Sequence, residues 1–544
     1  MLNRILFIFI SLFSGFFNSI QSQTNSIPRP KLVVGIVVDQ MRWDYLYRYY
    51  DRYSNDGFKR LLSEGYSCEN TMIPYTPTYT APGHTCIYTG SVPAIHGIIG
   101  NNWYSREAGR MVYCTDDSTV TTVGSSSTAG RMSPRSMWTT TVTDELRLAT
   151  NFHNKVIGIA LKDRASILPA GHSANAAYWF DNASGGWITS SYYMNDLPAW
   201  VKKLNDKKLP DQYLKKDWNT LYPIATYINS SKDKNIFESE IPGEAGDSFP
   251  HVTSTIKQDK YNSFRFTPSA ITYTFDMSKA AIEAEALGKN NETDFLAISL
   301  SSTDYIGHVF GPNSIEIEDT YLRLDKDLGD FLAYLDQQIG KGQYLIFLSA
   351  DHGVAHVPAF AREYKMPAGA MDDNSLRLLL NKAVDSAYKV KNAILYVVNY
   401  QVYTDAKAIR DAKGDADKIK NFIIQQLLSY PAIANAFYVN KLTEVALPQS
   451  LKNMLINGHN QELSGDVQFI FKPQWFDGGD AGTTHGAWNP YDSHIPLLWF
   501  GWHITPGKTN RETYMTDIAP TLAAMLHIQM PNGSIGHVIE EVAK

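Results

Sequence analysis

The sequence of 544 residues contains only three cysteines, Cys68, Cys86 and Cys114. So few cysteines exclude the disulfide framework that holds small exported domains together, and the odd number leaves at least one thiol unpaired. Which two of the three could pair does not follow from the sequence. With 44% hydrophobic residues, the chain can instead build a large core for its stability.

The sequence also lacks a block of positive charge. It has 49 lysines and arginines against 55 acidic residues, which gives a formal net charge of -6. Proteins that bind nucleic acid polymers carry a basic patch that neutralises phosphates. A nucleic acid polymer is therefore not an expected partner.

A mostly apolar run from Ile5 to Phe17 follows Arg4 and precedes small polar residues. The run is too short to cross a bilayer as a helix, and the pattern is typical of a secretory signal peptide. We expect residues 1–22 to be such a peptide, and the protein to be secreted, into the periplasm, without a stable membrane anchor. The alternative is a buried N-terminal strand or an anchor.

Apolar runs with the length of buried strands alternate with helical patterns. The expected strands are residues 32–38, 156–161, 295–300, 344–349 and 495–500, and the expected helices are 56–64, 279–287 and 317–339. This alternation predicts an α/β fold, with a mostly parallel central sheet and helices on both faces.

Two stretches break the alternation, residues 170–285 and 362–480. The first is irregular and rich in Tyr, Trp, Asn, Asp and Lys, and the second mixes a helical piece, 415–430, with strand-like segments such as 393–403. We expect both to be insertions that cap the sheet without extending it. Residues 23–169, 286–361 and 481–544 would then form the core.

Three of the expected strands lead into an acidic residue: Asp39, Asp304 and Asp351. A single acid after a strand is commonly a turn former or a helix cap. Ligands of open α/β sheets bind outside the carboxyl ends of the strands, so three acids at that edge can converge on one site.

Histidines accompany two of these acids. His308 follows Asp304 by four residues, one helical turn, and His352 follows Asp351 directly, while His485 lies in a Gly/Thr loop before the last strand. Mixed carboxylate and imidazole ligands suit zinc better than magnesium or calcium. The set is large enough for two ions, which can together stabilise the attacking and leaving oxygens in a phosphoryl displacement.

The stretch "YTPTYTAPGHTCIYTG", residues 75–90, mixes prolines and glycines with threonines. This composition predicts a rigid, hydroxyl-rich loop and disfavours a helix or a continuous strand. On local evidence alone, Thr80 would be an ordinary solvated hydroxyl. It becomes a nucleophile only if a base or a metal activates it.

These motifs, in this order, resemble the alkaline phosphatase superfamily. The resemblance covers most of the chain through the strand ending in Asp39, the Thr80 segment, "HGIIGNNWY", "SSTDYIGHVFGP", "SADHG", "THG" and "TDIAPTLAAML". Within the superfamily the sequence is most similar to the phosphate-irrepressible (PafA-type) bacterial alkaline phosphatases, which use a threonine nucleophile.

The resemblance implies a role for each site residue. It places Asp304, His308 and His485 around one zinc ion, and Asp39, Asp351 and His352 around a second, with Thr80 as nucleophile and ligand. Asn101 would donate to a phosphoryl oxygen, although Asn102 is adjacent and the register is open. Lys162 and Arg164 would meet the remaining oxygens, with Asp163 pointing away if this segment is extended; the alternative is a surface pair that closes a strand.

The expected function is therefore hydrolysis of small-molecule phosphate monoesters by a monomeric di-zinc enzyme, through a phosphothreonine intermediate. The near alternative is a nucleotide pyrophosphatase/phosphodiesterase, which shares the threonine and the six metal ligands but which Lys162 and Arg164 argue against. Two other enzyme classes are less expected because their nucleophile is not a threonine. Sulfatases use a modified Cys or Ser, and cofactor-independent phosphoglycerate mutases use a serine, whereas this sequence has Thr80. A non-catalytic binding protein would have no need to keep every ligand together with the threonine.

Overall fold

The computed structural model describes residues 28–544, so the expected signal peptide lies outside the described residues. Its central sheet has eleven strands in the order β17-β2-β18-β10-β1-β9-β6-β7-β8-β5, with β19 paired to β2. The parallel middle consists of β10 (Tyr344–Ser349), β1 (Leu32–Val38), β9 (Asp294–Leu300), β6 (Val156–Ala160) and β7 (Ala176–Asp181). Every residue of these strands is buried, as expected of parallel strands covered on both faces.

Antiparallel pairs occur towards the edges of the sheet. On one side lie β18 (Leu497–Gly501), β17 (His494–Ile495) and β2 (Tyr66–Met72), with β19 (Gly507–Tyr514) parallel to β2. On the other side lie β8 (Gly186–Ser190) and β5 (Thr122–Val123). The strand predicted at 495–500 is thus divided between β17 and β18, and β18 runs antiparallel to β10. The other four predicted strands are confirmed.

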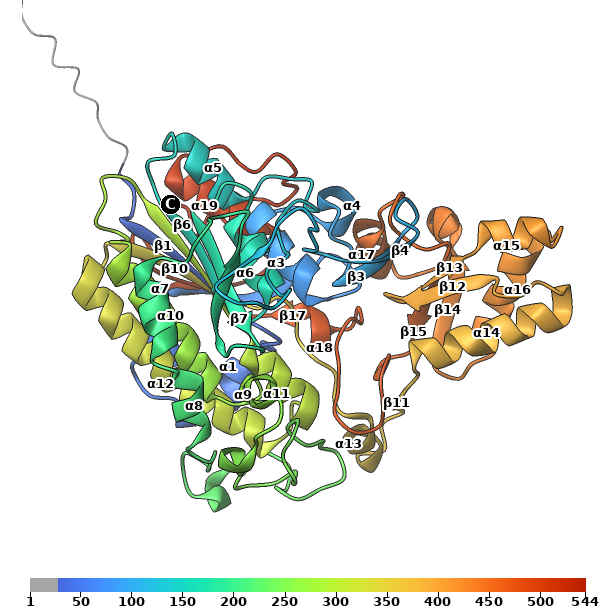
Figure 1. Cartoon of the computed structure of the whole chain (residues 1–544), viewed down its shortest axis with the longest axis horizontal. Helices are drawn as coiled ribbons and strands as arrows, with labels where there is room; N and C mark the ends of the chain where they lie inside the picture. Colours follow the sequence, from blue (N-terminus) through green and yellow to red (C-terminus); the bar gives the residue numbers. More distant parts are fainter. Residues whose placement is uncertain (1–27) are drawn as a thin grey trace, which may run out of the picture.

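Helices cover both faces of the sheet (Figure 1). One face carries α3 (Thr80–Thr89), α5 (Val142–Ala149), α6 (Asp163–Ala170) and α19 (Ile518–Leu526), and the other α2 (Phe58–Glu64), α7 (Ala199–Asp206), α10 (Ser269–Ala284) and α12 (Ile315–Leu335). The predicted α/β fold is confirmed. Of the predicted helices, 56–64 corresponds to α2, 279–287 to the end of a longer α10, and 317–339 to α12 with a π-helical turn after it.

The expectation that residues 170–285 only cap the sheet is wrong. Strand β7 pairs parallel to β6, β8 pairs antiparallel to β7, and α10 packs on β6 and β9. Both strands are short and aromatic, and each is fully buried. The two strands could not be recognised in the sequence, because they are short and lie in a polar stretch, and a hydrophobic pattern is weak over five or six residues.

The second insertion forms a unit with its own core, at the right of Figure 1. Its sheet has the order β12-β13-β15-β14, built from β12 (Ile394–Val398), β13 (Gln401–Thr404), β14 (Ile433–Tyr438) and β15 (Val467–Phe471). Helices α14 (Asp373–Tyr388) and α16 (Ala416–Leu428) pack against it, and α15 (Ala406–Asp411) packs on α16. The segment 393–403 is thus a hairpin, and the helix expected at 415–430 is α16.

The three cysteines are buried free thiols, so no pair of them forms a disulfide. Among residues 28–544, no helix has both the length and the apolar character that crossing a membrane requires.

Candidate active site

The three acids predicted at strand ends meet at one edge of the sheet. Asp39 directly follows β1, Asp351 comes two residues after β10, and Asp304 lies in the first turn of α11 (Ser302–Phe310), just after β9. Since β10, β1 and β9 are parallel neighbours, their carboxyl ends lie side by side. All three carboxylates are buried, with exposures of 2% or less.

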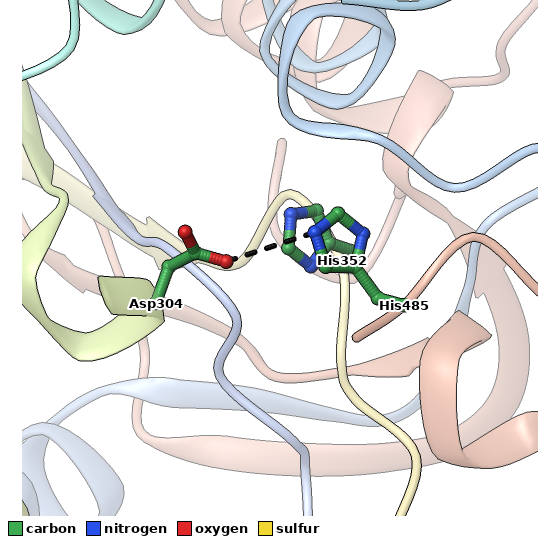
Figure 2. A group of neighbouring side chains, drawn as sticks. All are labelled: Asp304, His352 and His485. Carbon is green, nitrogen blue, oxygen red and sulfur yellow. Dashed lines mark ion pairs between the residues drawn. The ribbon is translucent and has the colours of Figure 1, made fainter. Parts of the chain in front are cut away.

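Histidine side chains complete two compact groups among the described residues. Asp304, His352 and His485 form one, and Asp39, Asp351 and His352 form the other, each with ligand atoms within 4.8 Å of one another. Figure 2 shows the two imidazole rings of the first group overlapping, with Asp304 directed towards them. His352 belongs to both groups, whereas His308 lies outside them, although its Nε2 is 3.1 Å from Asp304 Oδ1.

The three imidazoles are oriented by the backbone in the same way. Each Nδ1 lies at hydrogen-bond distance from a carbonyl oxygen: His308 from Thr483 at 2.7 Å, His485 from Thr78 at 2.7 Å and His352 from Gly353 at 2.9 Å. A carbonyl can only accept, so Nδ1 carries the proton and Nε2 faces the acids. This is the usual orientation of metal-binding histidines.

Two carboxylate oxygens at the centre of the site are buried without a hydrogen-bond partner in the described structure, Asp39 Oδ1 and Asp351 Oδ2. They lie 3.5 Å and 3.3 Å from His352 Nε2. Leaving charged oxygens buried and unpaired is costly, and binding a metal cation is one way in which proteins compensate such groups. The residues present therefore fit a divalent ion.

The electrostatics of the acids agree with this. Burial and the neighbouring Asp351 raise the pKa of Asp39 well above its ordinary value. Burial has the same tendency at Asp351, but His352 and His84 outweigh it and lower the pKa of Asp351. The raised pKa of Asp39 shows that burial and the neighbouring negative charges destabilise its ionised form. A bound cation would relieve this repulsion, so the group of carboxylates is suited to cations.

Thr80 is the first residue of helix α3, not part of a loop as predicted. Pro82 falls in the first turn, where its missing N–H has no helical partner to lose and its fixed φ suits a helix. The whole helix is buried, so tertiary packing outweighs its weak propensity. Thr80 Oγ1 lies 3.4 Å from His352 Nε2, and the helix N-terminus there favours an anion.

Asn101, rather than Asn102, contacts the first turn of α3 next to Thr80. Its Oδ1 accepts a hydrogen bond of 3.0 Å from the N–H of Ala81, which leaves the Nδ2 hydrogens for another acceptor. The Asn102 side chain is exposed at the start of β3 (Asn102–Ser105). The sequence left the choice between Asn101 and Asn102 open, and this contact favours Asn101.

The extended segment considered for Lys162 and Arg164 is not found, because helix α6 begins between these two residues, at Asp163. Lys162 is the N-cap of α6, and its Nζ lies 2.7 Å from Asp39 Oδ2 and 2.5 Å from Asp304 Oδ2, one acid from each group. Burial opposes its charge, but Asp304 and Asp39 outweigh burial and raise the pKa of Lys162. Its ammonium is within the site, and the alternative of an exposed surface pair is excluded for it.

Sequence reasoning missed two residues that contact this machinery. The hydroxyl of Tyr113 accepts a hydrogen bond from Arg164 Nη1 at 3.0 Å and donates one to Asp163 at 2.8 Å. Gln40 donates through Nε2 to Asp304 Oδ1 at 2.8 Å. The position of Gln40 directly after the strand-end acid could have indicated it, whereas nothing around Tyr113 in the sequence distinguishes it.

The site thus combines acids, imidazoles and a helix-terminal threonine at the carboxyl edge of a mostly parallel sheet. This is the arrangement of the alkaline phosphatase superfamily, the same superfamily that the sequence motifs resemble. Within it, the chain belongs to the type I phosphodiesterase / nucleotide pyrophosphatase family, whose sequence model matches residues 33–492.

Individual relatives match almost the whole chain. Alkaline phosphatase PhoV of Synechococcus elongatus is 54% identical over 95% of this chain and 94% of its own. A Myroides odoratus protein named a calcium-transporting ATPase is 52% identical over 97% of both. Alkaline phosphatase PafA of Elizabethkingia meningoseptica is 49% identical over 96% of both. A crystal structure of wild-type PafA has a TM-score of 0.94, covering 96% of this chain and 100% of that one.

Proposed function

We propose that this protein is a secreted alkaline phosphatase that hydrolyses phosphate monoesters with two zinc ions and Thr80 as its nucleophile. One observation carries the proposal: Thr80 Oγ1 lies 3.4 Å from Nε2 of His352, the residue that belongs to both candidate ligand groups. The PhoV and PafA relatives, named alkaline phosphatases, support the monoester substrate.

The proposed ligands follow the predicted division, with Asp304, His308 and His485 for one ion and Asp39, Asp351 and His352 for the other. Zinc bound there would act as a Lewis acid, favouring the deprotonated threonine and stabilising the attacking and leaving oxygens. The imidazole content of the set is the reason for preferring zinc to magnesium.

The reaction has two in-line steps. Thr80 Oγ1 attacks phosphorus, the P–O bond to the alcohol breaks, and a phosphothreonine forms. Water then attacks the same phosphorus, the bond to Thr80 breaks, and inorganic phosphate leaves. The buried first turn of α3 holds Thr80 in place, so little orientational freedom has to be lost in either step.

Charge that develops on the three non-bridging oxygens needs donors. Asn101 Nδ2, Lys162 and Arg164 are proposed to supply them. Lys162 lies between one acid of each ligand group, so its ammonium is at the junction where the phosphoryl group would be bound. The Tyr113 hydroxyl accepts a hydrogen bond from the Arg164 guanidinium and would help to hold it in place.

A phosphodiesterase is the second candidate, because the matching family model carries that description. The two are separated by comparing a phosphate monoester, a phosphate diester and a sulfate ester with the same leaving group. We expect the highest kcat/KM for the monoester. A diester preference would instead favour the phosphodiesterase, and a sulfate preference would contradict both.

A further inference from the structure

One of the contacts between the second insertion and the catalytic core is made by the turn of the β12–β13 hairpin. Val398 pairs with Gln401, which leaves a two-residue turn formed by Asn399 and Tyr400. Their φ angles are 59° and 60°, and each residue is only 5% exposed. Asn is common in such turns, but the second position usually takes Gly, and a bulky residue with positive φ is uncommon. Backbone of this kind persists where surrounding contacts fix it.

Asn399 packs on the chain on both sides of Asn101. Its Nδ2 donates a hydrogen bond of 2.8 Å to the carbonyl oxygen of Asn102. A methyl group on Gly100 would lie 2.7 Å from Asn399 Nδ2 and 2.8 Å from its Oδ1, so the amide rests directly on that glycine. With the Asn101 side chain already tied to Ala81, the segment is held between α3 and the hairpin.

Tyr400 makes the equivalent contact with the segment that carries His485. Its hydroxyl donates to the His485 carbonyl oxygen at 3.2 Å, and a methyl group on Gly486 would lie 2.5 Å from that hydroxyl. The Tyr400 ring also lies 6.3 Å from Tyr79, whose ring meets His485 edge-on at 5.6 Å. One turn therefore supports the backbone of two separate site loops.

We propose that Asn399 and Tyr400 are positioning residues, which fix Asn101 for phosphoryl binding and His485 for metal binding. The inference rests on the proposed function of the site. The second insertion would then complete the active site from outside the core. Residues that orient ligands in this way typically contribute 10- to 100-fold in affinity or activity, and a displacement of about 1 Å can cost as much.

The first test is Asn399→Gly, because glycine adopts positive φ freely and keeps the turn while removing the amide. Asn392→Gly is the matched control, since Asn392 has a φ of 54° in the same unit but is exposed. We expect Asn399→Gly to lower monoester kcat/KM about tenfold and to weaken inhibition by inorganic phosphate, with zinc content unchanged. The control should match the wild type.

A rescue experiment tests the contact itself. Gly100→Ala should lower kcat/KM, because the three atoms nearest to the added methyl group all belong to the Asn399 side chain. In the double variant Gly100→Ala/Asn399→Gly these atoms are gone, so kcat/KM should exceed that of Gly100→Ala by about threefold or more. Losses that simply multiply would overturn the positioning role of Asn399.

Tyr400→Phe tests the second contact without changing the ring. We expect it to lose zinc to a chelator about tenfold faster than the wild type, as measured by metal content and not only by activity. Tyr438→Phe is the control, because that hydroxyl donates to Asp417 O, at 2.8 Å, elsewhere in the unit. Equal zinc loss in the two variants would overturn the role of Tyr400.

The two levels of proposal fail in different ways. A zinc-loaded wild type without monoesterase activity would contradict the proposed function. An active wild type, with Asn399→Gly indistinguishable from Asn392→Gly, would overturn only the positioning role.

Discussion

The ring of His352 stacks on the ring of His485, with 3.4 Å between the centroids and 11° between the planes. Burial lowers the pKa of both histidines, and at His485 the nearby His352 lowers it further. Two stacked, buried imidazoles cannot both be charged, so they are suited to offer lone pairs to metal ions. The stack joins one histidine of each proposed ligand set, and the two ions would be close neighbours.

From this arrangement we expect a chelator to abolish activity, and zinc, but not magnesium alone, to restore it. His485→Ala and His352→Ala should each lower zinc affinity by at least about tenfold, since even the residues that only orient metal ligands contribute that much. His503→Ala serves as the control, because His503 is exposed. Metal analysis of the purified variants gives the result, and full recovery with magnesium would contradict the choice of zinc.

Thr80→Ala should reduce turnover to background, a loss on the order of 10⁴-fold or more, because the attacking oxygen is removed. Thr80→Ser should keep a substantial part of the rate, since it keeps the hydroxyl. Thr89→Ala, at the other end of α3, removes a hydroxyl that donates to the Thr85 carbonyl and accepts from the Ser91 N–H, away from the ligand groups, and should leave the rate unchanged. Acid-stable phosphate on residue 80 in quenched reactions would support the assignment, and near-normal rates for Thr80→Ala would refute it.

The sequence was most informative where a functional residue directly follows a buried strand, because the apolar run that marks the strand also locates the residue. Asp39, Asp304 and Asp351 each follow an apolar strand, so the rule for parallel sheets was enough to bring them together. The rule that Pro and Gly disfavour helices failed at Thr80, because Pro82 occupies a first-turn position and tertiary burial stabilises α3.

Other parts of the site could not be predicted because they depend on distant contacts. The hydrogen bond from Asn399 to Asn102 joins residues 297 positions apart, and no local pattern marks either one. Likewise, the start of α6 at Asp163 decides where Lys162 and Arg164 point, and helix boundaries are the least reliable part of sequence reasoning.

Outside the site, His251 should make stability depend on pH. It is buried between Glu244 and Glu316, with nitrogen to oxygen distances of 3.0 Å and 3.2 Å. Burial opposes protonation, but the hydrogen bonds to the two glutamates outweigh it and raise the pKa of His251 from 6.5 to about 9. A raised pKa means that the folded state holds the proton more tightly. This contribution, up to about 3 kcal/mol, is present below pH 6.5 and lost as pH rises through about 9.

The test compares the wild type with His251→Gln in urea at about pH 6 and about pH 10, below and above that window. We expect the variant to be less stable at the lower pH and the difference to shrink at the higher pH. His503→Gln, at an exposed position, should show no such difference. A stability difference between wild type and His251→Gln that is the same at both pH values would contradict the ion-paired histidine.

Changing Lys162 and Arg164 together to alanine should lower monoester kcat/KM at least about a hundredfold, and diester activity much less. A monoester presents three unesterified oxygens that two metals and Asn101 cannot all satisfy, whereas a diester has one fewer and carries a substituent where a cation would lie. Because Lys162 also pairs with Asp39 and Asp304, zinc content must be measured in the same variant. Retained zinc with a selective monoester loss supports substrate selection by this pair. Equal losses on both substrates would show that the pair supports the ligand groups instead, and the phosphodiesterase would become the better explanation.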